Sequence, residues 1–163
     1  MDNLRITIPD DMHVHLRQGP SMAHYARRIG DSFGRILVMP NLLPPITTPE
    51  SVTRYADAIQ HAAPGLKTLM TFKLMPGMGP SEIKALKGAG AIAGKYYPEG
   101  VTTNAEDGIR DTRELYPILE HLEAEDLVLC IHGETPDAPV LDRERAFLPQ
   151  LEEMADRFPR LRM

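Results

Sequence analysis

Short apolar runs alternate with longer amphipathic stretches along this chain of 163 residues, and glycine or proline separates most of them. The apolar runs predict buried strands, whereas stretches with apolar residues three or four apart predict helices. The Thr-Pro-Glu sequence at 48–50 supports one helix start, because it offers a capping hydroxyl, a proline in the first turn and an acid near the positive helix end. Strands are expected at residues 5–9, 12–16, 35–39, 68–75, 91–97 and 127–131, and helices at residues 21–29, 48–63, 81–88, 111–125 and 143–158.

The alternation of strands and helices predicts an α/β fold built from parallel β-α-β units with right-handed crossovers. About five such units follow the first strand. Pro117 and Pro149 fall inside the last two predicted helices, where each is expected to kink the helix or to mark a later start. Residues 160–163 begin another apolar run, so we expect the chain to stop, at Met163, just where a further strand begins.

The composition is that of a globular protein with an acidic balance, at 42% hydrophobic and 25% charged residues and a net charge of −5. A negative charge argues against nucleic acid or an anionic membrane as the main partner. No apolar run approaches the roughly 18 residues of a membrane helix. The single cysteine, Cys130, excludes a disulfide framework and indicates a reducing cytoplasm; we expect it to fill a small space in the core.

His13-Val14-His15 is the first candidate for chemistry. Residues two apart on a strand face the same way, roughly 6.6 Å apart along it, so the two imidazoles can converge on one metal ion. The alternative is a pair of exposed or hydrogen-bonded histidines, and the motif alone favours that alternative.

Two further residues lie at or near the ends of predicted strands. His132 directly follows the apolar run at 127–131, at the end of a parallel strand where open sheets and barrels carry their sites. It is either a structural histidine or a third ligand. Lys95 lies in a strand that otherwise reads as buried, and the pattern alone favours a lysine whose ammonium group reaches solvent.

Arg17 and Asn41 are candidates for binding an anion. Arg17 continues the alternation of His13 and His15, so it should face the same side, where its guanidinium suits a substrate carboxylate. Asn41 ends the Val-Met-Pro-Asn segment at 38–41 and either points its amide into the same region or makes an ordinary turn.

Together these segments resemble the N-terminal half of bacterial dihydroorotase, a family of the amidohydrolase superfamily. The resemblance rests on four segments in order: the His-x-His-Leu-Arg motif at 13–17, Met-Pro-Asn-Leu at 39–42 with two prolines after it, Lys-Tyr-Tyr-Pro at 95–98 followed by Thr-Thr-Asn at 102–104, and His-Gly-Glu at 132–134.

The resemblance implies a site with two zinc ions. His13, His15, Lys95 and His132 would be the metal ligands, with Lys95 converted by CO2 to a carbamate that bridges both ions. The carbamate makes chemical sense, since an ammonium cannot ligate zinc but a carbamate supplies two anionic oxygens.

The same resemblance assigns the substrate contacts. Arg17 and Asn41 would bind the substrate carboxylate, with His15 and His132 also facing the substrate, and Thr102 and Thr103 would lie on a mobile loop over it.

Two of the family's functional residues are not found in this chain. The general-base aspartate and the sixth-strand histidine of the family have no counterpart in this chain, and we expect both to lie beyond Met163. No catalytic residue in that sense is therefore assigned within residues 1–163.

The resemblance also implies an activity and a fold. The reaction is the interconversion of N-carbamoyl-L-aspartate and L-dihydroorotate in pyrimidine biosynthesis, so the partner is a small carboxylate. The fold is a (β/α)8 barrel, and residues 1–163 would supply the first part of this single domain, up to the sixth strand. We expect these residues alone to be inactive, and the complete enzyme to be a cytoplasmic homodimer.

Two alternatives remain open. The first is another cyclic-amide hydrolase of the dihydropyrimidinase or allantoinase type, against which the Arg17 and Asn41 pair argues because it suits a carboxylate. The second is a barrel fragment with a structural or binding role and no catalysis, against which the four intact candidate ligands argue.

Overall fold

The computed structural model describes residues 5–163, and the expected alternation is confirmed there. The strands are parallel and follow one another in the sheet in chain order. The strands are β1 (Asp10–Val14), β2 (Arg35–Val38), β3 (Lys67–Lys73), β4 (Ala91–Tyr96) and β5 (Val128–Ile131). The α-helices are α1 (Pro20–Gly30), α2 (Pro49–Ala62), α3 (Pro80–Gly88), α4 (Tyr116–Ala124) and α5 (Arg143–Arg157), with 3-10 turns η1 (Thr112–Leu115) and η2 (Val140–Asp142).

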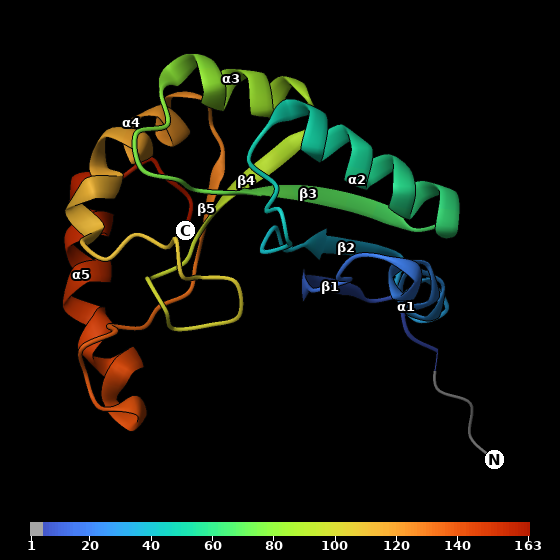
Figure 1. The fold of residues 1–163 in the computed structure, drawn as a ribbon, viewed down its shortest axis with the longest axis horizontal. Coiled ribbons are helices and arrows are strands. Elements are labelled where there is room, and N and C mark those ends of the chain that lie inside the picture. Colours follow the sequence, from blue (N-terminus) through green and yellow to red (C-terminus); the bar gives the residue numbers. More distant parts are fainter. Residues whose placement is uncertain (1–4) are drawn as a thin grey trace.

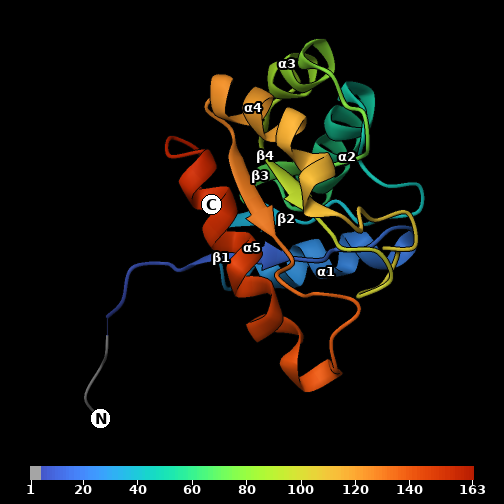
Figure 2. The same ribbon diagram turned by 90° about the vertical axis from the view of Figure 1, so that its left-hand side faces the viewer.

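The sheet curls into part of a barrel, with the helices along its outer side (Figure 1). The view turned by 90° shows α5 lying against the outer side of β5 (Figure 2). The main hydrophobic core lies between the outer face of the strands and the helices, and it includes Val38, Phe72 and Leu129 from strands and Ile59 and Leu122 from helices. The predicted fold class, a partial (β/α) barrel, is confirmed.

The predicted start of α2 is confirmed in atomic detail. The Thr48 hydroxyl accepts a hydrogen bond from the backbone N–H of Ser51 at 3.2 Å, and the Ser51 hydroxyl accepts one from the backbone N–H of Thr48 at 3.0 Å. Pro49 occupies the first turn, where its missing N–H costs nothing. This reciprocal pair fixes where the chain leaves the loop after β2 and enters the helix.

The strand predicted at residues 5–9 is wrong. This segment contains no assigned strand, and Ile6 and Ile8 are 75% and 60% exposed. Its backbone meets the sheet only at its end, where the carbonyl of Pro9 accepts a hydrogen bond from the N–H of Gly34 at 3.0 Å. Pairing with β2 instead begins at Asp10, so the first true strand starts two residues earlier than the run at 12–16 predicts.

The two prolines in the last predicted helices have different effects. Before Pro117 the chain forms the short 3-10 turn η1, and the α-helix begins only at Tyr116, so this proline marks a later start. Pro149 lies inside α5, which continues through it as one helix from Arg143 to Arg157.

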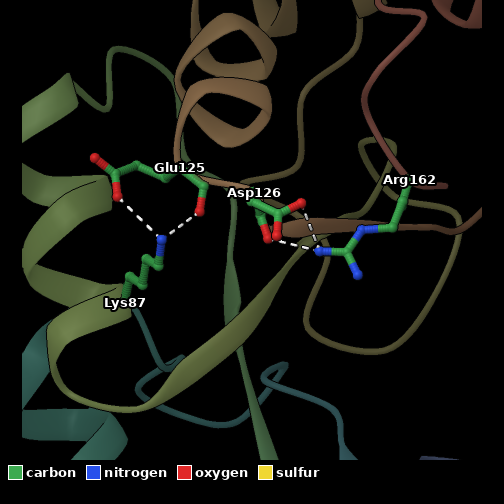
Figure 3. Close-up of polar contacts among 4 residues, drawn as sticks. All are labelled: Lys87, Glu125, Asp126 and Arg162. Carbon is green, nitrogen blue, oxygen red and sulfur yellow. Dashed lines mark hydrogen bonds and ion pairs between the residues drawn. The ribbon is translucent and has the colours of Figure 1, made fainter.

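After α5 the chain returns to the edge of β5. The carbonyl of Arg162 accepts a hydrogen bond from the N–H of Leu129 at 2.8 Å, and the Arg162 guanidinium donates to the backbone and side-chain oxygens of Asp126 at 2.8 Å each. Figure 3 shows this pair beside a second one, in which Lys87 at the end of α3 binds Glu125. These contacts tie the turn between α4 and β5 to its neighbours.

The further strand expected to begin before Met163 stays a prediction, because residues 160–163 alone of it belong to the sequence described. Residues 160–163 contain no assigned strand, and Met163 is 42% exposed. The segment starts as a turn, in which the N–H of Leu161 donates to the carbonyl of Phe158 at 3.0 Å. The bond between Leu129 and Arg162 therefore places the segment beside β5 without making it a strand of the sheet.

None of the helices formed by residues 5–163 is long and apolar enough to span a membrane.

Candidate metal centre at the carboxyl ends of the strands

The strand alternation decides which side chains face the inside of the curled sheet. On β4, Tyr96 stacks on Phe147 of α5 with ring centroids 6.2 Å apart, so Tyr96 faces outward and Lys95 faces inward. Lys95 pairs in register with Lys73 on β3 and with Cys130 on β5. Side chains in register on neighbouring parallel strands share a face, so these three line one layer of the interior.

His13 and His15 come together at the end of β1. Their Nε2 atoms lie 3.1 Å apart and their ring centroids 5.1 Å apart, so both imidazoles point at one place. The pKa of each is lowered, chiefly by burial; Lys95 adds to the effect on His13, and His13 itself adds to the effect on His15. A lowered pKa favours the neutral imidazole, which is the form that ligates a metal.

Lys95 is buried, with 1% of its surface exposed, so the solvent-reaching lysine favoured by the pattern alone is wrong. The curl of the sheet encloses the inner face at β4, where a flat sheet would leave it open. Burial lowers the pKa of Lys95 to about 8, and no carboxylate is among the groups that act on it. Its Nζ lies 5.2 Å from the ring centroid of Tyr97, the second residue after it.

His132 follows β5 as predicted, at the same end of the sheet. Its charge acts on the pKa of His13, which places it within electrostatic range of the histidine pair. Its Nε2 lies 2.7 Å from Oε1 of Glu134, whose other oxygen is 3.7 Å from the guanidinium of Arg143. Glu134 therefore engages one of the two ring nitrogens of His132 and leaves the other available.

Arg17 and Asn41 both lie close to His15. The charge of Arg17 lowers the pKa of His15, and the amide of Asn41 raises it. The strand alternation that predicted the place of Arg17 does not extend to it, because β1 ends at Val14 and Arg17 has a left-handed backbone with φ of 62°. The hydroxyl of Tyr55 on α2 donates to the carbonyl of Arg17 and fixes this turn.

Asn41 also contacts the loop after β4. Its side-chain Nδ2 donates to the backbone carbonyl of Thr103 at 3.0 Å. The backbone carbonyl of Asn41 accepts a hydrogen bond from Nδ2 of Asn104 at 2.9 Å. The Asn41 Oδ1 atom is buried near His15 and makes no hydrogen bond of ordinary geometry within residues 5–163, so it can accept one from His15 or from another group. Thr102, which is partly exposed, and Thr103, which is exposed, lie in this loop beside the end of β2.

Cys130 is only half-buried, because it faces the interior beside Lys95 and not the main core between the sheet and the helices. Burial raises the pKa of its thiol. The prediction that Cys130 fills a space in the main core is therefore wrong. The raised pKa of its thiol also argues against a role as a nucleophile.

Three residues of this region were not found from the sequence. Lys73 lies on the inner face beside Lys95, Tyr97 packs its ring near both lysines, and Glu134 binds His132. Lys73 could have been found, since it stands in a strand of buried residues two positions after Thr71. The role of Glu134 depends on how the chain turns after β5, which no local pattern encodes.

Within residues 5–163 no group of three or more His, Cys, Asp or Glu side chains is placed to hold a metal ion. The candidate set found here has two histidines and a lysine as its centre. It therefore depends on a modified Lys95 for its third ligand.

Comparison with known proteins gives a consistent result along the whole chain. A dihydroorotase from Shewanella amazonensis is 40% identical over 168 aligned residues that cover 100% of this chain, and one from Azoarcus sp. is 41% identical over 170. This chain is a relative of the dihydroorotases. It spans about half the length of these curated relatives, 49% in both cases. No family profile matches it.

Solved dihydroorotases have the same fold. The dihydroorotase of Saccharomyces cerevisiae in complex with 5-fluoroorotic acid superposes with a TM-score of 0.90 at 37% identity, over 94% of this chain and 46% of that one. The enzyme from Campylobacter jejuni gives 0.86 at 32% identity, over 98% and 50%. An L-hydantoinase from Arthrobacter aurescens shares only 17% identity at a TM-score of 0.71, which shows the fold alone. The resemblance to half a dihydroorotase is confirmed.

Proposed function

We propose that this chain carries the metal-binding half of a dihydroorotase site, which interconverts N-carbamoyl-L-aspartate and L-dihydroorotate. The proposal is supported by the paired imidazoles of His13 and His15, and by buried Lys95, whose charge acts on the pKa of His13, in a chain that aligns along its whole length with dihydroorotases. Neither the paired imidazoles nor the buried lysine has a structural task that explains it.

The residues present fit zinc. His13 and His15 would hold one ion through their neutral imidazoles, and His132 would contribute to a second, with a carbamate on Lys95 shared between them. Bound zinc would supply Lewis-acid activation of the amide carbonyl and of water. Among these residues His132 and the bridging group alone would hold the second ion, so we expect it to bind less tightly than the first.

Lys95 is suited to carbamate formation. With a pKa of about 8, about a tenth of it is the neutral amine at pH 7, whereas an ordinary lysine is almost fully protonated. The neutral nitrogen forms a bond to the carbon of CO2 and loses a proton to solvent, leaving an anionic carbamate. The lysine is buried without a carboxylate partner, so metal ions would be the natural counter-charge for that anion.

The substrate contacts follow from the charges around the histidine pair. Arg17 and Asn41 would bind the carboxylate of the substrate, and His15 and His132 would border it. Thr102 and Thr103 would face it from the loop. The complex of the yeast relative with 5-fluoroorotic acid, a carboxylic acid, supports an anionic substrate here.

The rest of the proposal concerns the complete protein. We expect the general base to come from a segment beyond Met163, and the complete enzyme to be a cytoplasmic homodimer that binds neither nucleic acid nor membrane.

The test is a substrate comparison with the zinc-loaded chain supplemented with the C-terminal half of a dihydroorotase. Hydrolysis of dihydroorotate but not of the neutral rings dihydrouracil and allantoin is expected. Hydrolysis of the neutral rings in preference to dihydroorotate would overturn the assignment and favour the dihydropyrimidinase or allantoinase type. Binding of zinc without any hydrolysis would leave the non-catalytic alternative as the better account.

A further inference from the structure

A second buried lysine lies beside Lys95 on the inner face. Lys73 is 1% exposed and stands in register with Lys95, with its Nζ 5.9 Å from the ring centroid of Tyr97. A buried ammonium group needs a compensating partner, because moving an unpaired charge out of water is strongly unfavourable. The candidate ligand set does not use Lys73, so its partners indicate a separate role.

Those partners come from the loop between β4 and η1, residues 97–111. Lys73 Nζ donates to the carbonyl of Asn104 at 2.9 Å and forms an ion pair with Asp107. The Asp107 side chain is 49% exposed, so the pair joins a buried cation to a carboxylate at the surface. The ammonium group of Lys73 on β3 thus contacts the loop from the inner face of the sheet.

The same loop is tied to a second strand. At the end of β2, the side-chain amide of Asn41 donates to the backbone carbonyl of Thr103, and that of Asn104 donates to the backbone carbonyl of Asn41. Asn104 has a left-handed backbone with φ of 58°. Inside the loop, the N–H of Gly100 donates to the carbonyl of Ala105 at 2.8 Å and the N–H of Gly108 donates to the same carbonyl at 3.0 Å. A loop that leaves β4 is therefore anchored at β3 and at β2, across the carboxyl ends of three strands (Figure 1).

We propose that Lys73 is a positioning residue, which anchors the loop at 102–107 over the candidate metal centre through Asp107 and the Asn104 carbonyl. The part played by Thr102 and Thr103 toward a substrate rests on the proposed function. The anchoring itself rests only on these contacts.

The test measures amide hydrogen exchange of Gly100 and Gly108 by NMR in the 163-residue chain. Asp107→Asn removes the charge but keeps the size, and we expect exchange of both amides to be about tenfold faster, as for the loss of a charge-assisted contact. Asp107→Glu keeps the carboxylate and should stay within about twofold of the unmodified chain. Equal exchange in the unmodified chain and Asp107→Asn would overturn the proposal, and so would equal acceleration in the Asn and Glu variants.

Two controls sharpen the test. Lys87→Met breaks the Lys87–Glu125 pair of Figure 3, at the amino-terminal end of β4, and should leave both amides unchanged. In a folded Lys73→Met chain, adding Asp107→Asn should cause no further acceleration, and a further tenfold increase would contradict the pairing. Zinc content should be the same in Asp107→Asn and the unmodified chain, so absence of zinc would count against the proposed function without touching the exchange result.

Discussion

At the scale of residues, the candidate site combines groups whose environments suit different tasks. Burial lowers the pKa of the two histidines and of Lys95, which favours neutral nitrogen in all three. The neighbouring Lys73 keeps its buried charge paired with Asp107. One lysine is thus left available for chemistry, while the other is engaged in holding a loop.

Lys95→Ala is expected to lower the zinc content of the chain to less than half, because the bridging carbamate is lost along with the amine. Propionate added at millimolar concentration should restore part of the zinc content, since a small carboxylate can occupy the space of the missing carbamate. Elemental analysis after dialysis measures both. Full zinc content in Lys95→Ala without propionate would contradict the role given to Lys95.

Arg17→Met should weaken the interaction with dihydroorotate while leaving zinc content unchanged. A carboxylate that loses its charge-assisted partner is expected to lose about 1.5–3 kcal/mol, or roughly tenfold to a hundredfold in kcat/KM of the supplemented enzyme. Steady-state assays of Arg17→Met and the unmodified enzyme measure this. A kcat/KM within a factor of two of the unmodified enzyme would show that Arg17 does not contact the substrate.

At the scale of elements, β4 determines the geometry of the site, and its close approach to the helices depends on one glycine. A Cβ atom on Gly94 would lie 2.7 Å from the Leu74 side chain and 3.3 Å from Leu122 of α4. Gly94 therefore lets α4 pack directly on β4, immediately before Lys95.

Gly94→Ala is expected to lower the free energy of unfolding by about 1–3 kcal/mol, the range for overpacking a filled core. The matched control is Gly88→Ala at the end of α3, where an added Cβ meets nothing within 4 Å and stability should not fall. Urea unfolding followed by circular dichroism measures both. If Gly94→Ala is as stable as the control, the side chains around Gly94 accommodate an added methyl group, and the close packing of α4 on β4 does not depend on this glycine.

The strands, the helices and the parallel order could be predicted from the sequence, because each apolar run is bounded by turn residues and amphipathic helices follow. The exposed path of residues 5–9 could not, since their alternation of apolar and polar residues is typical of a strand but they do not pair with the sheet. His13 and His132 could be placed because strand parity and strand ends are local properties, and His15 directly follows the end of β1. The burial of Lys95 and the contacts of Lys73 and Glu134 depend on the curl of the sheet and on loop paths, which are not local.

At the scale of the whole molecule, the chain spans about half the length of its relatives and forms a curled sheet with β1 and β5 at its edges. The backbone N–H of Leu129 on the β5 edge is already bonded to Arg162. The remaining edge groups and the inner face would be covered by further strands in a closed barrel.

The purified chain alone is therefore expected to show no dihydroorotase activity and to self-associate through its edges. Size-exclusion chromatography with light scattering, together with an activity assay, measures both properties. Addition of a separately expressed C-terminal half should restore activity and reduce self-association. Activity of the chain alone equal to that of a complete enzyme would contradict the expectation that the general base lies beyond Met163.

The most direct test of the central claim is the zinc content of the purified chain, compared with His15→Ala and with His24→Ala, whose histidine lies exposed on α1. The unmodified chain and His24→Ala should each retain about one zinc ion after dialysis, held by His13, His15 and modified Lys95. His15→Ala should retain almost none. Equal zinc in all three chains, or none in the unmodified chain, would contradict the account.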